Sequence, residues 1–198
     1  MRVDDSSVGF DVVGFRVVEL DAADAPRLHH FFEKSPEYFE RIFGEVPGPD
    51  EVISEVLDPP PDGWVFTKNW ILGFIDEQEN LSGIATVVSD LLAPGVWHIG
   101  LFVLDSALHG GGAAHRLFAG VERWALDNGA HWLRLGVVEG NTRAERFWQR
   151  CGFTQCRTRG AIQMGRRSNT IRVMVKPLTV GTLPDYLSLV PRDRPESA

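Results

Sequence analysis

The apolar run Ile99–Leu104 (IGLFVL) leads into the loop Leu108–Ala114 (LHGGGAA), and this succession decides the fold. The run is typical of a strand, while apolar or small side chains after the loop recur at a helical spacing, at Ala114, Leu117, Phe118, Val121 and Ala125. Glycines let consecutive backbone N–H groups turn toward one point, and the start of a helix adds free N–H groups and a positive dipole end. The segment predicts a strand, an anion-binding loop and a helix.

The glycine loop taken alone also fits other structures. Three glycines can form an ordinary flexible turn, so the spacing by itself does not establish an anion site. A nucleotide-binding P-loop is disfavoured, because no Lys followed by Ser or Thr comes after Gly112. The sequence further along the chain has to decide between these hypotheses.

That sequence contains a second strand and a second helix. Asn128-Gly129 indicates a helix end, and Trp132–Val138 alternates as a strand. Asn141 or Thr142 can cap the next helix, which Gly152 ends. Its apolar face consists of Ala144, Phe147, Trp148 and Cys151.

With both motifs in place, the chain resembles the GNAT superfamily of N-acetyltransferases, most clearly from Trp97 to Phe153. The family's Arg/Gln-x-x-Gly-x-Gly/Ala loop corresponds to His109–Ala114. Its later motif is similar to Asn141, Ala144, Phe147-Trp148 and Gly152-Phe153. The resemblance implies an α/β fold with a mixed, mostly antiparallel sheet of about seven strands flanked by helices. The sheet is expected to splay between its fourth and fifth strands.

The resemblance also implies acetyl-CoA as acyl donor and direct attack by the primary amine of a small molecule or peptide, with no covalent cysteine intermediate. Loop amides would hold the pyrophosphate, and the backbone of 101–103 would bind the pantetheine arm. The implied cofactor-binding residues are Leu101, Phe102, Val103, His109, Gly110, Gly111, Gly112, Ala113, Ala114, Asn141, Ala144, Phe147 and Trp148.

Two residues depart from the family's pattern. His109 replaces the usual Arg or Gln of the loop, although a nearby phosphate would favour its imidazolium form. Trp148 stands where many members carry the Tyr that is thought to protonate the departing thiolate, and an indole N–H does not titrate near pH 7. An alternative hypothesis is therefore an acyl-CoA-binding regulatory protein of the same fold with impaired catalysis.

General-base candidates come from the strands. Alternation places His98, Gly100 and Phe102 on one face of their strand, and Gly100 predicts a bulge. An imidazole with an ordinary pKa near 6.5 suits removal of a proton from an ammonium group, so His98 is the first candidate and Asp90 a second.

The acceptor site is expected at two helices near the N-terminus. Asp21 and Ser35 are plausible caps, with Pro36 at a first helical position. The GNAT resemblance places such helices beside the acceptor, and the substrate-binding candidates are Phe32, Glu33, Tyr38 and Phe39. An acid there would meet a cationic amine.

Composition bounds the remaining properties. A net charge of −7 argues against nonspecific nucleic-acid binding. No run approaches a membrane span and no apolar signal core occurs, so a cytoplasmic protein without membrane contact is expected. Cys151 and Cys156 lack metal-ligand spacing, and no metal is expected.

The expected organisation is a disordered segment 1–8, one domain over 9–178 and a tail over 179–198. We expect the tail to pack on its own domain or on a partner subunit of a homodimer. Further strands are expected at Val12–Leu20, in a second strand region made of Trp64–Phe66 and Trp70–Ile75, and at Leu81–Leu92, with two more between Thr158 and Lys176.

Overall fold

A computed structural model describes residues 8–45, 48–58, 60 and 63–195 of the protein. These residues form an eight-stranded sheet: β1 (Gly9–Val12), β2 (Phe15–Glu19), β3 (Asn69–Asp76), β4 (Leu81–Val88), β5 (Val96–Leu104), β6 (Trp132–Val138), β7 (Thr154–Met164) and β8 (Arg167–Pro177). The spatial order is β1-β2-β3-β4-β5-β6-β8-β7, and only β5 and β6 are parallel neighbours. The expected mixed, mostly antiparallel sheet is confirmed.

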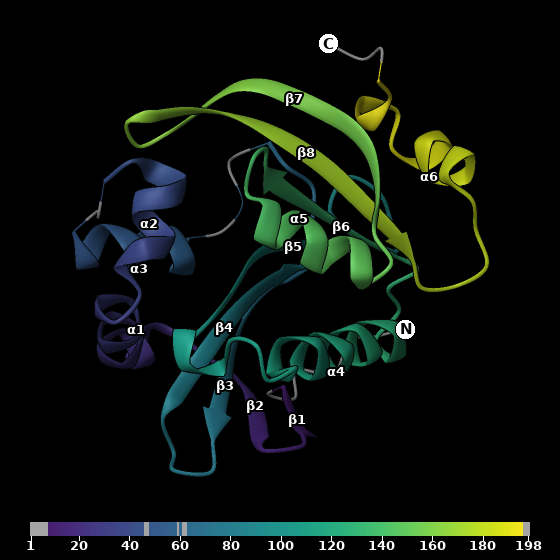
Figure 1. The fold of residues 1–198 in the computed structure, drawn as a ribbon. Coiled ribbons are helices and arrows are strands. Elements are labelled where there is room, and N and C mark those ends of the chain that lie inside the picture. Colours follow the sequence, from purple (N-terminus) through teal and green to yellow (C-terminus); the bar gives the residue numbers. More distant parts are fainter. Residues whose placement is uncertain (1–7, 46–47, 59, 61–62, 196–198) are drawn as a thin grey trace.

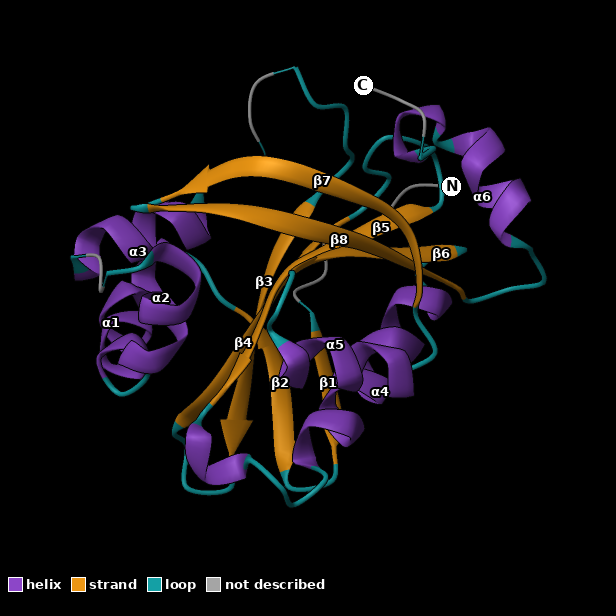
Figure 2. Ribbon diagram, turned by 45° about the horizontal axis from the view of Figure 1, so that its top comes forward, coloured by secondary structure: helices purple, strands orange, loops and turns teal. Residues whose placement is uncertain are grey.

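Helices cover both faces of this sheet (Figures 1 and 2). The α-helices are α1 (Ala25–Glu33), α2 (Pro36–Phe43), α3 (Pro49–Leu57), α4 (Ala113–Asp127), α5 (Thr142–Arg150) and α6 (Leu183–Leu189), with short 3-10 turns η1 (Ala22–Asp24), η2 (Ser106–Leu108) and η3 (Pro191–Asp193). Helices α1–α3 lie on one side, and α4 and α5 on the other. Within the described part of the chain, no helix is long and apolar enough to cross a bilayer.

The two-residue alternation of the strands sorts their side chains between these helix layers. Leu72 and Phe74 of β3 pack into the core under α4, whereas Ile71 packs with Leu28 and Phe32 of α1. Both cores exclude water, because Leu72, Phe74 and Leu28 are fully buried. The sheet therefore has a buried hydrophobic core on each face, between it and the helices that cover that face.

The strand count exceeds the expected seven because the first strand, expected at Val12–Leu20, is a hairpin. Gly14, with φ of 83°, turns β1 back onto β2, a backbone conformation that glycine adopts without strain. Trp64–Phe66 forms no strand. The strand expected at Leu81–Leu92 ends at Val88, since Asp90 (φ 55°) and Leu92 (φ 74°) leave the extended region.

Gly100 is the predicted bulge, and the bulge overturns the expected alternation along β5. Thr86 of β4 pairs with Leu101 and Val87 with Ile99, so Gly100 has no partner on β4. The extra residue reverses which side chains share a face: Ile99 and Phe102 pack toward the same core. His98 and Phe102 are therefore not on one face.

The C-terminal segment packs on its own sheet. Tyr186 of α6 and Val190 are buried against Trp132, Val173 and Val175 of β6 and β8. Figure 1 shows α6 beside the end of β8, away from α1–α3. Disorder was expected for residues 1–8, and all of these except Val8 lie outside the described residues.

Candidate active site

The sheet opens into a wedge between β5 and β6. The two strands pair only from Val96–Ile99 to Trp132–Leu135; beyond this, β5 continues along β4 and β6 continues along β8. Residues 101–104 therefore have no strand partner on the β6 side, where a strand edge presents N–H and C=O groups. The splay expected between these two strands is confirmed, and it starts at the Gly100 bulge.

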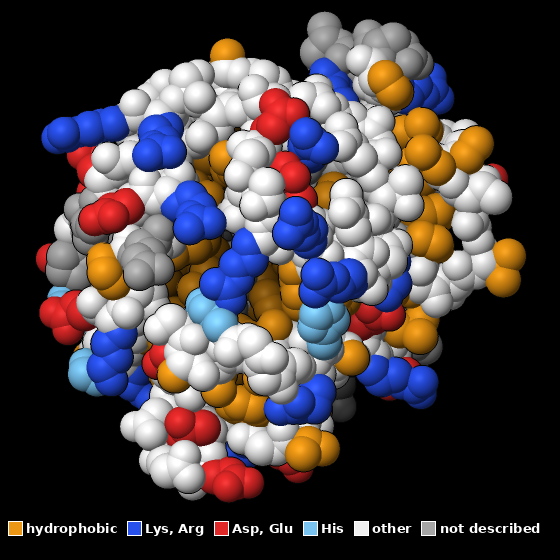
Figure 3. All heavy atoms as spheres, in the orientation of Figure 1, with side chains coloured by type: hydrophobic (Ala, Val, Ile, Leu, Met, Phe, Trp, Pro, Cys, Tyr) orange, Lys and Arg blue, Asp and Glu red, His pale blue; other side chains and the backbone are white. Residues whose placement is uncertain are grey.

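A cavity of about 410 Å³ lies at this wedge. Figure 3 shows it as a hollow with a hydrophobic interior and Lys, Arg and His side chains around it. Three parts of the chain line it: the α1–α2 junction, β5 with the following turn, and α5. The lining residues are Lys34, Ser35, Pro36, Tyr38, Arg41, Phe102, Val103, Leu104, Ser106, His109, Ala114, Asn141, Arg143, Ala144, Phe147 and Trp148.

The glycine loop lies beside this cavity, and Gly112 stands directly before α4. Gly110 and Gly112 have φ of 86° and 75°, which only glycine adopts readily. Gly110 through His115 donate no backbone hydrogen bond to the described residues, and Arg116 N–H is the first to bond back, to Gly112 O at 3.2 Å. A row of N–H groups is thus available at the positive end of a helix.

Arg116 adds a charge to this loop that sequence reasoning missed. Its Nη1 donates to Gly111 O at 3.2 Å, which holds the guanidinium against the glycines. Arg116 lies on α4, four residues after Gly112. Residues four apart are neighbours on a helix, so this spacing could have predicted that Arg116 lies beside the loop. The positive charge near the loop therefore does not depend on His109 alone.

Aromatic side chains from β5 and α5 form the apolar part of the cavity. Phe102 stacks on Phe147 with ring centroids 5.8 Å apart and meets Trp148 edge-on at 5.7 Å. Trp148 is only 7% exposed and also packs on Phe118 and Phe153. Trp148 is thus mainly a core residue with one edge at the cavity.

Asn141 is the N-cap of α5, one of the two predicted caps. Its Oδ1 accepts a hydrogen bond from Ala144 N–H at 3.4 Å. Glu145 Oε1 accepts a hydrogen bond from Gly140 N–H at 3.0 Å, just before the cap. The cap fixes Asn141, Arg143 and Ala144 at the cavity edge.

Neither predicted base, His98 nor Asp90, lines the cavity. His98 Nδ1 lies 3.2 Å from Nη1 of Arg134, on the side where the C-terminal segment packs. Although the residue is partly exposed, desolvation of the ring and the Arg134 charge lower the pKa of His98 to about 3. Asp90 accepts hydrogen bonds from Thr67 Oγ1 and Gly95 N–H, both at 2.7 Å. The geometry favours structural roles for both residues.

His98 predicts a pH dependence of stability. The unfolded chain takes up a proton at its ordinary pKa near 6.5, but folded His98 stays neutral down to about pH 3. Stability is therefore lost as the pH falls below 6.5, with a slope of at most about 1.4 kcal/mol per pH unit. Urea unfolding between pH 7.5 and 4.5 should show this extra slope in the wild type and not in His98→Asn. Equal slopes in both proteins would contradict the assignment.

Among the four residues predicted to bind the acceptor, only Tyr38 lines the cavity. Phe32 and Phe39 are 4% and 3% exposed and belong to the core under α1. Glu33 is exposed, with Oε1 3.5 Å from Nδ1 of His29 on the same helix. Sequence reasoning missed Lys34, Arg41 and Arg143, which neighbour the predicted residues in sequence but gave no motif.

The described residues were also compared with the requirements of a metal site. Within residues 8–45, 48–58, 60 and 63–195, no three His, Cys, Asp or Glu side chains gather in a way that would hold a metal ion. The two cysteines are free. Burial raises the pKa of each thiol to about 11, which makes both weak nucleophiles.

Comparison with known proteins agrees with this architecture. A sequence model of the Acetyltransferase (GNAT) family matches residues 17–153. No curated protein shows a significant sequence match to the chain.

Solved structures with a similar fold include several acetyltransferases. An acetyltransferase from Thermus thermophilus has a TM-score of 0.66 at 21% identity, covering 85% of this chain and 99% of that one. Spermidine N-acetyltransferase from Vibrio cholerae, in complex with CoA and spermine, has a TM-score of 0.65 at 16% identity, covering 88% and 99%. Ribosomal-protein-S5-alanine acetyltransferase from Vibrio fischeri has a TM-score of 0.67 at 13% identity, covering 86% and 96%. At these identities the likeness extends to the fold alone.

Proposed function

The chain belongs to the GNAT family of acetyltransferases, and from this premise we propose that it transfers the acetyl group of acetyl-CoA to the primary amine of a small-molecule or peptide acceptor. The observation that carries the proposal is the wedge between β5 and β6. It joins an unpartnered strand edge, a loop of available N–H groups and a cavity in one continuous region. A long donor with phosphates at one end and a thioester at the other fits that arrangement.

The donor would lie along the wedge with its pyrophosphate at the glycine loop. N–H groups from Gly110 to His115 and the guanidinium of Arg116 would hold the phosphate oxygens. The backbone edge of 101–103 would pair with the amides of the pantetheine arm as an added strand does. Asn141 would contact the same arm from α5.

In the reaction, the lone pair of a neutral amine attacks the thioester carbonyl carbon. The C–N bond forms, the C–S bond breaks, and the thiolate of CoA leaves and takes up a proton. The attacking nitrogen loses one proton before the attack, if it starts as ammonium, and one after it. Orienting donor and amine together can supply several kcal/mol of the barrier reduction.

We propose that proton transfer uses side chains of the cavity lining, which includes neither His98 nor Asp90. The indole of Trp148 does not titrate. Tyr38 and His109 line the cavity and are of types that act as acid or base catalysts; Lys34 is another such residue, but its ammonium group is assigned to binding below. We assign proton transfer to these two side chains, directly or through water.

Calorimetric titration with acetyl-CoA, with ATP as control ligand, tests the proposal. We expect binding near micromolar, about −8 kcal/mol, and no comparable binding of ATP. A thiol reagent that detects released CoA should then report turnover with primary amines. Binding without turnover on any amine would support the regulatory acyl-CoA-binding alternative. Absence of acetyl-CoA binding would remove both.

A further inference from the structure

The charge of the cavity lining is opposite to that of the whole protein. The chain carries 27 acidic and 20 basic residues, for a net charge of −7. Among the described lining residues, however, Lys34, Arg41 and Arg143 are cationic and none carries a carboxylate. A cavity for a polycationic amine would be expected to show the reverse.

Ion pairing does not occupy these three cations among the residues that the structure describes. Some basic residues elsewhere in the described chain are paired, as in Arg16–Glu79, Arg123–Asp127 and Lys176–Glu122, and others, such as Arg146, are not. What distinguishes Lys34, Arg41 and Arg143 is that they line the cavity with no described carboxylate bound to them.

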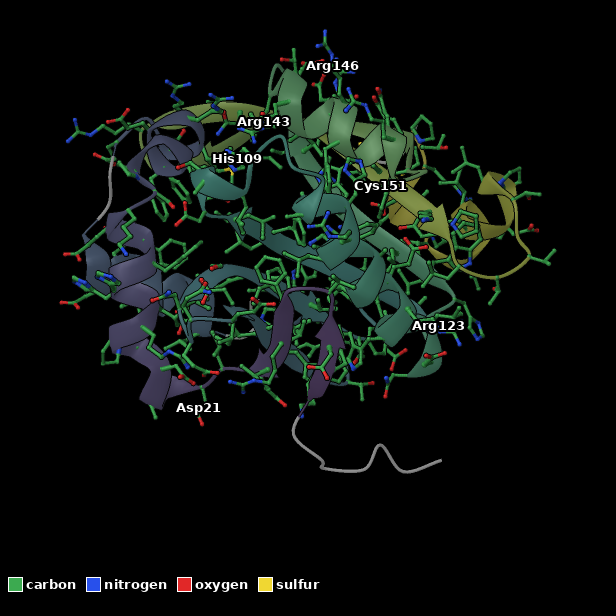
Figure 4. The ribbon with its side chains drawn as sticks, turned by 60° about the horizontal axis from the view of Figure 1, so that its bottom comes forward. Asp21, His109, Arg123, Arg143, Arg146 and Cys151 are labelled. Atoms are coloured by element: carbon green, nitrogen blue, oxygen red, sulfur yellow. The ribbon has the colours of Figure 1, made fainter. Side chains whose placement is uncertain are left out.

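Helix electrostatics explains only part of this cluster. Lys34 and Arg41 lie at the C-terminal ends of α1 and α2, where a cation is favourable. Arg143 lies in the first turn of α5, where the positive end of the dipole disfavours it. Figure 4 shows Arg143 near His109, while Arg146 of the same helix lies farther from His109, toward the outside of the molecule.

We infer that the acceptor is an amine that also carries an anionic group, a carboxylate or a phosphonate, which Lys34 and Arg41 bind. This inference rests on the proposed acetyl transfer. Lys34 and Arg41 reach the cavity from the α1–α2 side, whereas the glycine loop, Arg116 and α5 provide the expected donor site. The acidic group is therefore assigned to the acceptor and not to the phosphates of CoA.

The same cations would help to activate the nucleophile. Nearby positive charges disfavour the ammonium form of a bound amine and lower its pKa. Such a cavity supplies neutral amine without a carboxylate base, in agreement with the positions of His98 and Asp90 outside the lining. Binding of the acid and activation of the amine thus follow from one charge distribution.

Matched substrates test the inference through the rate of CoA release. Amino acids are compared with their amides, aminoalkylphosphonates with the corresponding alkylamines, and spermidine serves as polycation. We expect at least a tenfold higher kcat/KM for the acid of each pair that reacts, as one charge-assisted contact provides. Amides or spermidine that react as well as the acids would overturn the inference and leave the acetyltransferase proposal intact.

Variants identify the residues that recognise the acid. Lys34→Met and Arg41→Met keep much of each side chain's apolar length and remove the charge. Each should lower kcat/KM for acids about tenfold, mainly through KM, abolish discrimination against amides, and leave the Kd of acetyl-CoA unchanged. Arg146→Met, an exposed cation of α5 outside the lining, is the control and should change none of these quantities. Weakened acetyl-CoA binding with discrimination retained would assign the cations to the donor.

An equilibrium measurement covers the case in which no amine reacts. The same acid and amide pairs are titrated into the complex with CoA. Tighter binding of the acids, lost in Lys34→Met, supports the inference; equal binding of the pairs, or no binding of any acid, overturns it. If the wild type fails to bind acetyl-CoA at all, the proposed function fails first, so the two failures are distinguishable.

Discussion

Gly112→Val is expected to weaken acetyl-CoA binding at least about a hundredfold, or about 2.7 kcal/mol, while the protein stays folded. Gly112 precedes α4 with φ of 75°, and a Cβ there would meet only Arg116 Nη1 at 3.5 Å, an ordinary contact. The folded protein therefore has room for the valine side chain. The same side chain would block a phosphate from reaching the N–H groups of the loop. Calorimetry with acetyl-CoA gives the affinity, and urea unfolding gives the stability.

Gly129→Val is the matched control, because it also places valine at a positive φ, at the other end of α4. Gly129 has φ of 100° and no atom near the added Cβ. Both variants should lose about 1–2 kcal/mol of stability from a left-handed non-glycine residue. Only Gly112→Val should lose donor binding. Unchanged affinity in Gly112→Val, or equal losses in both variants, would rule out the loop as the phosphate site.

Asp193→Ala should cost about 3–5 kcal/mol of unfolding free energy, because it leaves a buried guanidinium without its partner. Arg134 Nε and Nη2 donate to the two oxygens of Asp193 at 2.7 and 3.1 Å, with the side chains 6% and 0% exposed. Tyr186 Oη donates to the same carboxylate at 2.7 Å. Denaturant unfolding at pH 7 measures the loss.

Asp127→Ala provides the comparison at the surface. Asp127 accepts from Arg123 Nε at 2.9 Å, but those side chains are 52% and 74% exposed, so the loss should stay below about 1 kcal/mol. The double variant Arg134→Met/Asp193→Leu should recover part of the stability, since both charges of this pair are removed, while Tyr186 Oη loses its acceptor and Arg159 its ion-pair partner. A loss in Asp193→Ala no larger than in Asp127→Ala would show that the buried pair contributes little.

Acid should weaken the same ion pair only at low pH. Burial opposes ionisation of Asp193, but the hydrogen bonds and charge of Arg134 outweigh it and hold its pKa below the usual value. The stabilisation is therefore present above the unfolded-state pKa near 3.9 and is lost as the pH falls below it. The effect of His98 begins near pH 6.5 and continues to about pH 3, so of the two groups only His98 acts between pH 6.5 and about 4, and both act below that range.

The sequence predicted those parts of the protein that local rules determine. Glycines before α4, the Asn141 cap and the apolar spacing of α5 each constrain a few consecutive residues, and all form as expected. Gly100 was identified as a bulge for the same reason, because a mid-strand glycine has a local meaning. The splay itself followed from the family resemblance.

Features that depend on packing between distant segments were not predictable. The charge of the cavity comes from the α1–α2 junction and from α5, whose residues meet only in the fold. The surroundings of His98 were not predictable either, because Arg134 and the C-terminal segment come from distant parts of the sequence. The alternation along β5 also failed, because it was counted across the bulge without the one-residue shift that a bulge introduces.

The buried ion pair also has a consequence for protein synthesis. Arg134 and Asp193 are 59 positions apart, so at ~5–20 residues per second the ribosome adds the carboxylate about 3–12 s after the guanidinium. During that interval β6 would have to bury a charge without its counter-ion, at a cost comparable to the whole stability of a domain. The sheet around β6 is therefore expected to reach its full stability only once residue 193 is available to pair with Arg134.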